Sequence, residues 1–245
     1  MEMYHKGLGF KYLLDTKYFR DRPVKDDLGF LPPPPADKSY FNAPKHALPE
    51  PDLELQHSLW ECLKNRRSIR RYSDTPITRK ELSNLVWATQ GVTEKIGHHL
   101  LRTAPSAGAL YPFETYLYLN NVEGFEKGLY HLHVASFSLE ELKKGDFSKE
   151  LAEAALGQRM VARAGVVFLW SAVPLRCMAK YRNRGIRYIF LDLGHLCQNL
   201  QLAATALGLG SCPIGAFFDD ELNELLELDG IEESIVYLNP VGKLS

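Results

Sequence analysis

Hydrophobic positions along the chain recur at helical spacing in several stretches. Leu55, Leu59, Trp60 and Leu63 follow this spacing, and the pattern stops at the basic stretch NRRSIRRY. We therefore expect a helix whose apolar side chains, Trp60 included, face a core and whose end carries arginines.

A second helix is marked by a capping box. Thr78 and Glu81 have the spacing at which each side chain bonds the main chain of the other. The positions that follow form one apolar face and a glycine stop: Leu82, Leu85, Val86 and Gly91. Residues 148–156 also favour a helix. Residues 187–207 predict a long one, with an apolar arc wide enough to be covered by the domain core or by a second subunit.

Strand patterns alternate with these helices. Residues 115–120 and 128–133 are rich in Tyr and Leu and predict an antiparallel pair. The continuously apolar residues 166–173 indicate a central strand covered on both faces. A short strand through SCPIGAF, a small helix starting at Asp219 or Asp220 and a strand through SIVYLNPVG complete the chain. Because no regular βαβ repeat is visible, we expect an α+β fold.

The first part of the chain has a different composition. Residues 20–51 are rich in Pro, Asp and Lys and contain the run Pro32 to Pro35, which holds the backbone near polyproline II. Such a run is typical of SH3 ligands, but in a chain of this kind we interpret it as a stiff connector. We divide the chain into an arm, residues 1–54, and a domain, residues 55–245.

Composition limits the function classes. The 245 residues are 45% hydrophobic with a formal net charge of -1, which argues against nucleic acid or an anionic membrane as the main partner. The four cysteines lie far apart without a CxxC pair, so we expect neither a disulfide framework nor a structural metal. The longest apolar run, residues 164–173, is too short to span a bilayer. We expect a cytoplasmic protein.

Two kinds of segment could bind a ligand. Arg66, Arg67, Ser68 and Arg70 gather guanidinium forks and a hydroxyl that match phosphate oxygens. The alternative is a solvated basic turn at a helix end. The stretch APSAGALYP, which contains Ala109, leaves its backbone bare for a flat aromatic ligand, or is a loop that packs closely on another backbone.

Two later segments carry similar chemistry. In CPIGAF, small residues follow a strand-like pair, so the backbone can approach a ligand. The terminal PVGK adds Gly242 and the cation of Lys243. GxGxxG and GxxxxGK[ST] are both absent from the sequence, so neither a Rossmann nor a P-loop nucleotide site is supported.

The order of RRSIR, APSAGALYPFE, ALGLGSCPIGAF and PVGK, from Arg66 to Lys243, resembles the FMN-dependent nitroreductase family, and specifically its SagB-type dehydrogenase branch. The resemblance implies a central, mainly antiparallel sheet flanked by helices in an intertwined homodimer, with FMN at the subunit interface. The arm lies outside the resemblance.

The resemblance also assigns residues to the cofactor. Arg66, Arg67 and Ser68 would hold the phosphate, with Lys243 beside Gly242 adding a contact, and Arg70 would face the ribityl chain or pyrimidine edge and stabilise charge on the ring. The opposite subunit would donate Pro105, Ser106, Ala107 and Gly108. The backbone facing flavin N5 would be that of Pro213, Ile214, Gly215 and Ala216. Many nitroreductases instead have a Glu-Gly pair at Gly215-Ala216 and Asn at Ala109, which weakens the transfer of their substrate preference to this chain.

Lys180 and Tyr181 match the adjacent Lys-Tyr pair that the SagB-type branch is thought to use for proton removal in azoline oxidation. A lysine kept from water near Arg182, Arg184 and Arg187 would lose its proton more readily. The alternative is a solvated basic loop after a core strand.

Three functions remain open. The first is an FMN-dependent oxidoreductase that transfers hydride in a ping-pong manner through flavin N5, from NAD(P)H or a substrate C–H to an organic acceptor. The second is an azoline dehydrogenase that tailors thiazoline or oxazoline peptides. The third is a flavin-binding sensor or storage protein without catalysis. The expected partners are a second copy of the chain and a small-molecule or peptide substrate.

Overall fold

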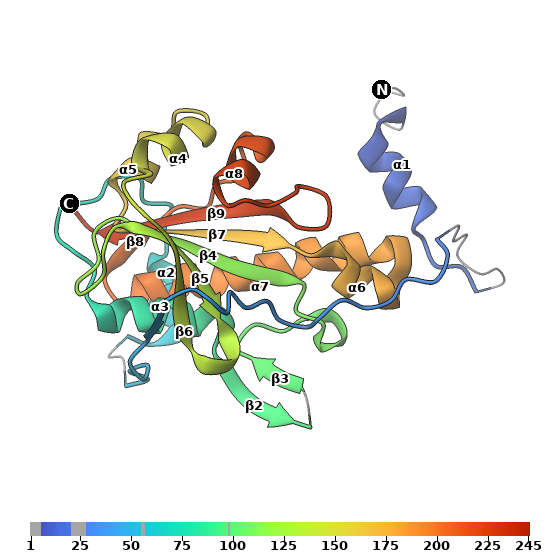
Figure 1. Ribbon diagram of the computed structural model, residues 1–245, viewed down its shortest axis with the longest axis horizontal. Helices are drawn as coiled ribbons and strands as arrows, with labels where there is room; N and C mark the ends of the chain where they lie inside the picture. The colour runs from blue at the N-terminus through green and yellow to red at the C-terminus, as the bar shows by residue number, and fades with distance from the viewer. Residues whose placement is uncertain (1–5, 21–27, 55–56, 98) are drawn as a thin grey trace.

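The computed structural model describes residues 6–20, 28–54, 57–97 and 99–245, and its centre is a seven-stranded sheet (Figure 1). Its strands lie in the order β1-β6-β5-β4-β7-β9-β8, and every neighbouring pair is antiparallel. Their bounds are β1 Lys45–Ala47, β4 Phe113–Leu119, β5 Gly128–His133, β6 Ser138–Lys144, β7 Val166–Ala172, β8 Leu209–Ser211 and β9 Ser234–Lys243. A separate hairpin is formed by β2 Val92–Ile96 and β3 His99–Arg102.

Helices cover both faces of the sheet. The helices of the described residues are α1 Leu8–Asp15, which lies apart from the sheet (Figure 1), and α2 Leu59–Asn65, α3 Arg79–Gln90, α4 Ser148–Ala154, α5 Arg159–Arg163, α6 Pro174–Tyr181, α7 Gly185–Ala206 and α8 Asp219–Leu225. Because side chains alternate along a strand, β4 sends Leu117 into a core with α3 and α7, and Tyr116 into a second core with α4, α5 and α8. The α+β prediction, with a mainly antiparallel sheet flanked by helices, is confirmed.

Most predicted elements form where their local signals lie. The capping box at the start of α3 is present: the Thr78 side chain accepts from the Glu81 main chain, and Glu81 bonds back to the Thr78 amide. The predicted antiparallel pair corresponds to β4 and β5, with Tyr116 opposite His131. The continuously apolar stretch is β7, buried along its whole length between β4 and β9.

Several details differ from the sequence predictions. Trp60 is 77% exposed, and Leu59 and Leu63 are also exposed, so the apolar face predicted for α2 does not face the core of this chain. The short strand comes before SCPIGAF rather than running through it, since β8 ends at Ser211. Leu55, part of the α2 pattern, lies outside the described residues. In the part of the chain that the structure describes, no helix is long and apolar enough to cross a membrane.

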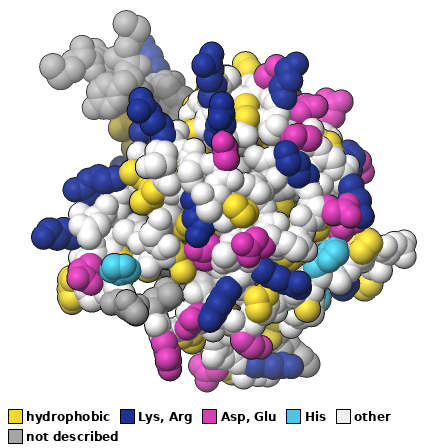
Figure 2. Space-filling view, turned by 90° about the vertical axis from the view of Figure 1, so that its left-hand side faces the viewer, with side chains coloured by type: hydrophobic (Ala, Val, Ile, Leu, Met, Phe, Trp, Pro, Cys, Tyr) yellow, Lys and Arg dark blue, Asp and Glu magenta, His cyan; other side chains and the backbone are white. Residues whose placement is uncertain are grey.

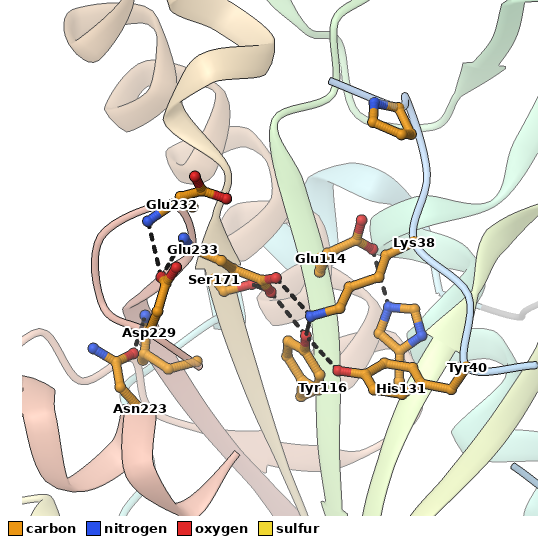
Figure 3. Close-up of polar contacts among 12 residues, drawn as sticks. Lys38, Tyr40, Glu114, Tyr116, His131, Ser171, Asn223, Asp229, Glu232 and Glu233 are labelled. Atoms are coloured by element: carbon orange, nitrogen blue, oxygen red, sulfur yellow. Dashed lines mark hydrogen bonds and ion pairs between the residues drawn. The ribbon is translucent and has the colours of Figure 1, made fainter. Parts of the chain in front are cut away.

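The arm is more than a connector. It contains α1, passes across one face of the sheet (Figure 1) and adds β1 to the sheet edge beside β6. Figure 3 shows two of its side chains, Lys38 and Tyr40, among buried polar groups. Lys38 Nζ lies 2.7 Å from Oε2 of Glu233 and 2.9 Å from the hydroxyl of Tyr116. Part of the arm thus belongs to the sheet. The domain boundary at residue 54 stays a prediction.

A row of buried polar side chains lies under the arm. His131 is fully buried between two carboxylates, with Nε2 3.0 Å from Glu114 and Nδ1 2.9 Å from Glu140. The arm supplies further partners to Glu140, through the Tyr40 amide at 3.0 Å and Lys45 Nζ at 3.0 Å. Burial opposes ionisation of Glu140, but these hydrogen bonds outweigh it and lower its pKa to about 2. The arm is thus fixed to the sheet by a buried carboxylate that stays charged.

Candidate active site

The arginine turn, residues 66–70, follows α2 and carries guanidinium groups at the surface. Arg66 leaves helical geometry and donates from Nη1 to Oε1 of Gln201 at 3.1 Å. Arg67 donates to two main-chain carbonyls of its own turn region, and Arg70 makes a long bond of 3.4 Å to a carbonyl in the same turn. Among the described residues, no carboxylate pairs with these three arginines. Their positive charge is available to an anion.

The segment CPIGAF lies beside the arginine turn. Ser68 forms a bridge with Ser211, and the Ile69 amide donates to the Ser211 carbonyl at 2.9 Å. A Cβ on Gly210 would come within 2.7 Å of Ile69, so the glycine permits this close approach. The sequence therefore leads from β8 directly to residues 213–216, where Gly215 and Ala216 are exposed.

The C-terminal PVGK also meets the turn region, but its residues have other partners. A Cβ on Gly242 would lie 2.6 Å from the ring of Tyr72, so this glycine is required by packing. Lys243 Nζ forms an ion pair with Oε1 of Glu81 at 2.6 Å. A phosphate contact from Lys243 remains a prediction, and it would have to compete with this carboxylate.

The small-residue loop, Pro105 to Ala109, is anchored by a residue that the sequence analysis missed. Asp192, on α7, accepts from the Ser106 hydroxyl at 2.6 Å and from the Ala107 amide at 3.0 Å. It is 4% exposed, and this burial raises the pKa of its carboxyl although the two bonds oppose the shift. Its sequence signal is a carboxylate inside the apolar arc of a helix. Such a buried carboxylate must accept hydrogen bonds from nearby donors.

The candidate Lys-Tyr pair lies against the same loop. Gly108 has a φ of +65°, and a Cβ there would be 2.7 Å from the Tyr181 hydroxyl and 2.8 Å from Lys180 Nζ. Both residues belong to the last turn of α6, which Pro174 begins. Gly108, which has no side chain, thus leaves room for two polar groups that are distant from it in sequence.

The surroundings of Lys180 differ from the prediction. Its side chain is exposed, so this chain alone does not remove it from water. The neighbouring arginines bond to the arm: Arg182 donates to the Gly29 carbonyl at 2.7 Å, and Arg184 donates to the Thr16 carbonyl at 2.6 Å. The pair also lies at a helix end, not in the loop of the alternative interpretation.

Within one chain, the predicted site falls into two separate halves. The arginine turn reaches α7 at Gln201, whereas the small-residue loop reaches it at Asp192. The helix between these two contacts rises roughly 13 Å at about 1.5 Å per residue. The structure brings the turn together with CPIGAF and PVGK, and the loop together with Lys180 and Tyr181, but it does not join the two groups.

Charge elsewhere does not form a single field. Figure 2 shows the end of the molecule that lies at the left of Figure 1, and its Lys and Arg side chains are interspersed with Asp and Glu. The net charge of -1 agrees with this distribution. The arginine turn is therefore a local group of cations rather than part of a broad basic surface.

Replacing Gly108 by alanine should disturb the Lys-Tyr pair. The positive φ alone costs about 1–2 kcal/mol for a residue with a Cβ, and the new methyl group would overlap the two polar side-chain ends. Gly97→Ala is the matched control, because Gly97 has a φ of +59° with nothing within 4 Å of its Cβ position. In thermal unfolding, we expect both variants to lose a similar amount of stability. In an activity assay of the purified protein, we expect only Gly108→Ala to lose turnover. Equal turnover in the two variants would contradict this placement.

Comparison with known proteins gives three findings. Residues 63–243 match the model of the Nitroreductase family. The "Putative nitroreductase MJ1384" of Methanocaldococcus jannaschii is 40% identical over 193 residues, which cover 79% of this chain and 94% of that protein. The trifolitoxin-processing protein TfxB of Rhizobium leguminosarum bv. trifolii is 33% identical over 143 residues, 56% of this chain and 38% of that protein.

A solved structure has the same architecture. The crystal structure of a "putative nitroreductase" from Anabaena variabilis superposes with a TM-score of 0.77 at 27% identity. The match covers 96% of this chain and 47% of that chain, so this chain spans about half its length.

Proposed function

Since this chain belongs to the nitroreductase family, we propose that it is an FMN-dependent oxidoreductase that acts as a homodimer. The observation that carries the proposal is the arginine turn, where three guanidinium groups have no carboxylate partner among the described residues and the turn contacts Ser211, which leads to the exposed residues Gly215 and Ala216. Unpaired guanidinium forks beside accessible main chain are the donor set that a phosphate with an attached flat ring requires.

The residues present fit a flavin mononucleotide. Arg66, Arg67 and Ser68 would hold its phosphate, and Arg70 would stabilise negative charge on the ring system. When bound, the flavin would supply a two-electron acceptor for a donor such as NAD(P)H or a substrate C–H, and a reductant for an organic acceptor. The protein's task is to seat the ring and leave one face open to each substrate in turn.

A second copy of the chain would complete the site. In a single chain the arginine turn and the small-residue loop contact α7 roughly 13 Å apart, at about 1.5 Å per residue, and no contact among the described residues joins them. An antiparallel pairing of two protomers would bring the turn of one beside the loop of the other. The exposed apolar side chains of α2, Leu59, Trp60 and Leu63, and of α7, Phe190 and Leu191, support such an interface.

Within this function, a dehydrogenase of the SagB type is the favoured specialisation. Two observations support it: the contact of Lys180 and Tyr181 with Gly108, and the similarity to TfxB, a trifolitoxin-processing protein. Tyr181 and Lys180 would bind beside the substrate ring, and the unprotonated amine would take a proton from a thiazoline or oxazoline. The second hydrogen would leave with two electrons as a hydride, and a flavin held beside the substrate would be required to accept it.

The test begins with the purified protein. Release and identification of a bound chromophore should give FMN, in a ratio near one per protomer, from a dimer by light scattering. Anaerobic mixing with NADPH, NADH or a thiazoline-containing peptide should then bleach the flavin with at least one of them. Protein that binds FAD or no flavin would contradict the proposal. Protein that binds FMN but is reduced by none of these donors would support the sensor or storage alternative.

A further inference from the structure

The N-terminal arm contacts the segment that directly follows the Lys-Tyr pair. Arg187 donates from Nε to the Thr16 hydroxyl at 2.7 Å and also bonds the Leu13 carbonyl. Arg184 donates from Nη1 to the Thr16 carbonyl at 2.6 Å. These acceptors lie at the C-terminal end of α1, where the partial charge of the helix is negative and attracts arginine.

Hydrogen bonds hold the arm there. The structure gives α1 no buried side chain, and its Tyr12 hydroxyl donates to the Asn183 carbonyl at 3.1 Å. Thr16, just after the helix, is only 2% exposed. The arm and the segment from residue 182 to residue 188 are thus joined by hydrogen bonds around the buried Thr16.

A chain of ring contacts leads from the arm to Tyr181. The guanidinium of Arg184 lies 4.4 Å from the ring centroid of Tyr18 and donates from Nε to the Tyr188 hydroxyl at 2.9 Å. The Tyr188 ring meets that of Tyr181 edge to face, with centroids 4.8 Å apart. Burial opposes ionisation of Tyr188, but the bond from Arg184 and the interaction with Tyr18 outweigh it and lower its pKa.

Tyr181 needs such external support. It is the last residue of α6, and Arg182 after it has a φ of +54°, a conformation that breaks the helix. The direction of the Tyr181 ring is therefore not fixed by a continuing helix. The Tyr188 ring on one side and Gly108 on the other limit where it can lie.

We propose that the arm segment Tyr12 to Tyr18 positions Tyr181, and Lys180 beside it, through Arg184 and Tyr188. The inference deepens the proposed function, because it rests on Lys180 and Tyr181 being the catalytic pair. Tyr18, Arg184 and Tyr188 are positioning residues that touch neither substrate nor flavin. The arm then belongs to the active site although it lies outside the family-matched region.

The first test needs no flavin. Tyr18→Ala removes the ring on which Arg184 lies, and Lys17→Ala, at an exposed neighbouring position, is the matched control. In hydrogen exchange of the purified full-length protein, we expect amides 180–188 to exchange at least fivefold faster in Tyr18→Ala than in Lys17→Ala. Exchange within β7 should be the same in both. Unchanged exchange at 180–188 would overturn the proposal.

The second test asks whether the effect passes through Tyr181. With a thiazoline-containing peptide as substrate, Tyr18→Ala and Tyr188→Phe should each lower kcat about five- to tenfold while KM, flavin content and NADPH-driven flavin reduction stay unchanged. In a Tyr181→Ala background, Tyr18→Ala should cause no further loss. An equal loss in both backgrounds would overturn the positioning role.

The two failures are distinguishable. A protein without flavin, or one in which Tyr181→Ala oxidises the peptide as fast as the wild type, would show that the proposed function or its catalytic pair is wrong. A wild-type protein that depends on Tyr181, but whose kcat is indifferent to Tyr18 and Tyr188, would show that the arm alone has been misassigned.

Discussion

Replacing both Arg66 and Arg70 by alanine should give a folded but colourless protein. A charge-assisted hydrogen bond contributes roughly 1.5–3 kcal/mol, so losing two should weaken flavin mononucleotide binding roughly 10²- to 10⁴-fold. Flavin stoichiometry, read from visible absorbance after desalting, measures the effect. Because Arg66 also bonds Gln201, a loss of about 1 kcal/mol in unfolding free energy is expected as well.

The matched control for this variant is Arg71→Ala. Arg71 is an exposed arginine of the same basic stretch, but no flavin contact is assigned to it. It should keep its colour and its melting temperature. A double variant as yellow as this control would show that the arginine turn does not bind the flavin phosphate.

Replacing Lys180 by alanine should separate the two half-reactions. Flavin content and reduction by NADPH should be unchanged, because the Lys180 side chain is exposed and no flavin contact is assigned to it. Oxidation of a thiazoline-containing peptide should fall roughly 10²- to 10⁴-fold, the usual contribution of a positioned base. Anaerobic flavin bleaching with each donor measures both.

Lys180→Arg tells a base from a fixed charge. Arginine keeps the positive charge but does not give up its proton in proteins. If Lys180 accepts a proton, this variant should be as impaired as Lys180→Ala. Wild-type oxidation in either variant would exclude Lys180 as the base.

The fold was predictable where its signals are local. The capping box of Thr78 and Glu81, the continuous apolar run of β7 and the apolar arc of α7 each depend on residues close in sequence. The exposure of Trp60 was not predictable, because an apolar helix face has the same pattern whether it meets a core or another subunit. The arm was misread as a connector because its anchors, among them Lys38 with Glu233, join residues far apart in the chain.

The candidate site was predictable only in part. Arginine and small-residue motifs indicate which groups can bind a flavin. The division of those groups into two halves depends on which part of α7 each one contacts, and the sequence does not show this. The contact of Gly108 with Lys180 and Tyr181 depends on the same packing. Arg184 and Arg187 bond to main-chain carbonyls of the arm, and such acceptors have no signature in the sequence.

The buried polar residues under the arm limit how far the chain can be truncated from its N-terminus. A polypeptide trimmed to the family-matched residues 63–243 would lose Lys38, Tyr40 and Lys45, leaving Glu140 and Glu233 without several of their donors. Stranding a buried charge costs roughly 3–5 kcal/mol, a large share of the stability of a typical domain. The bare edge of β6 would also be open to pairing with other molecules, so such a fragment would tend to precipitate.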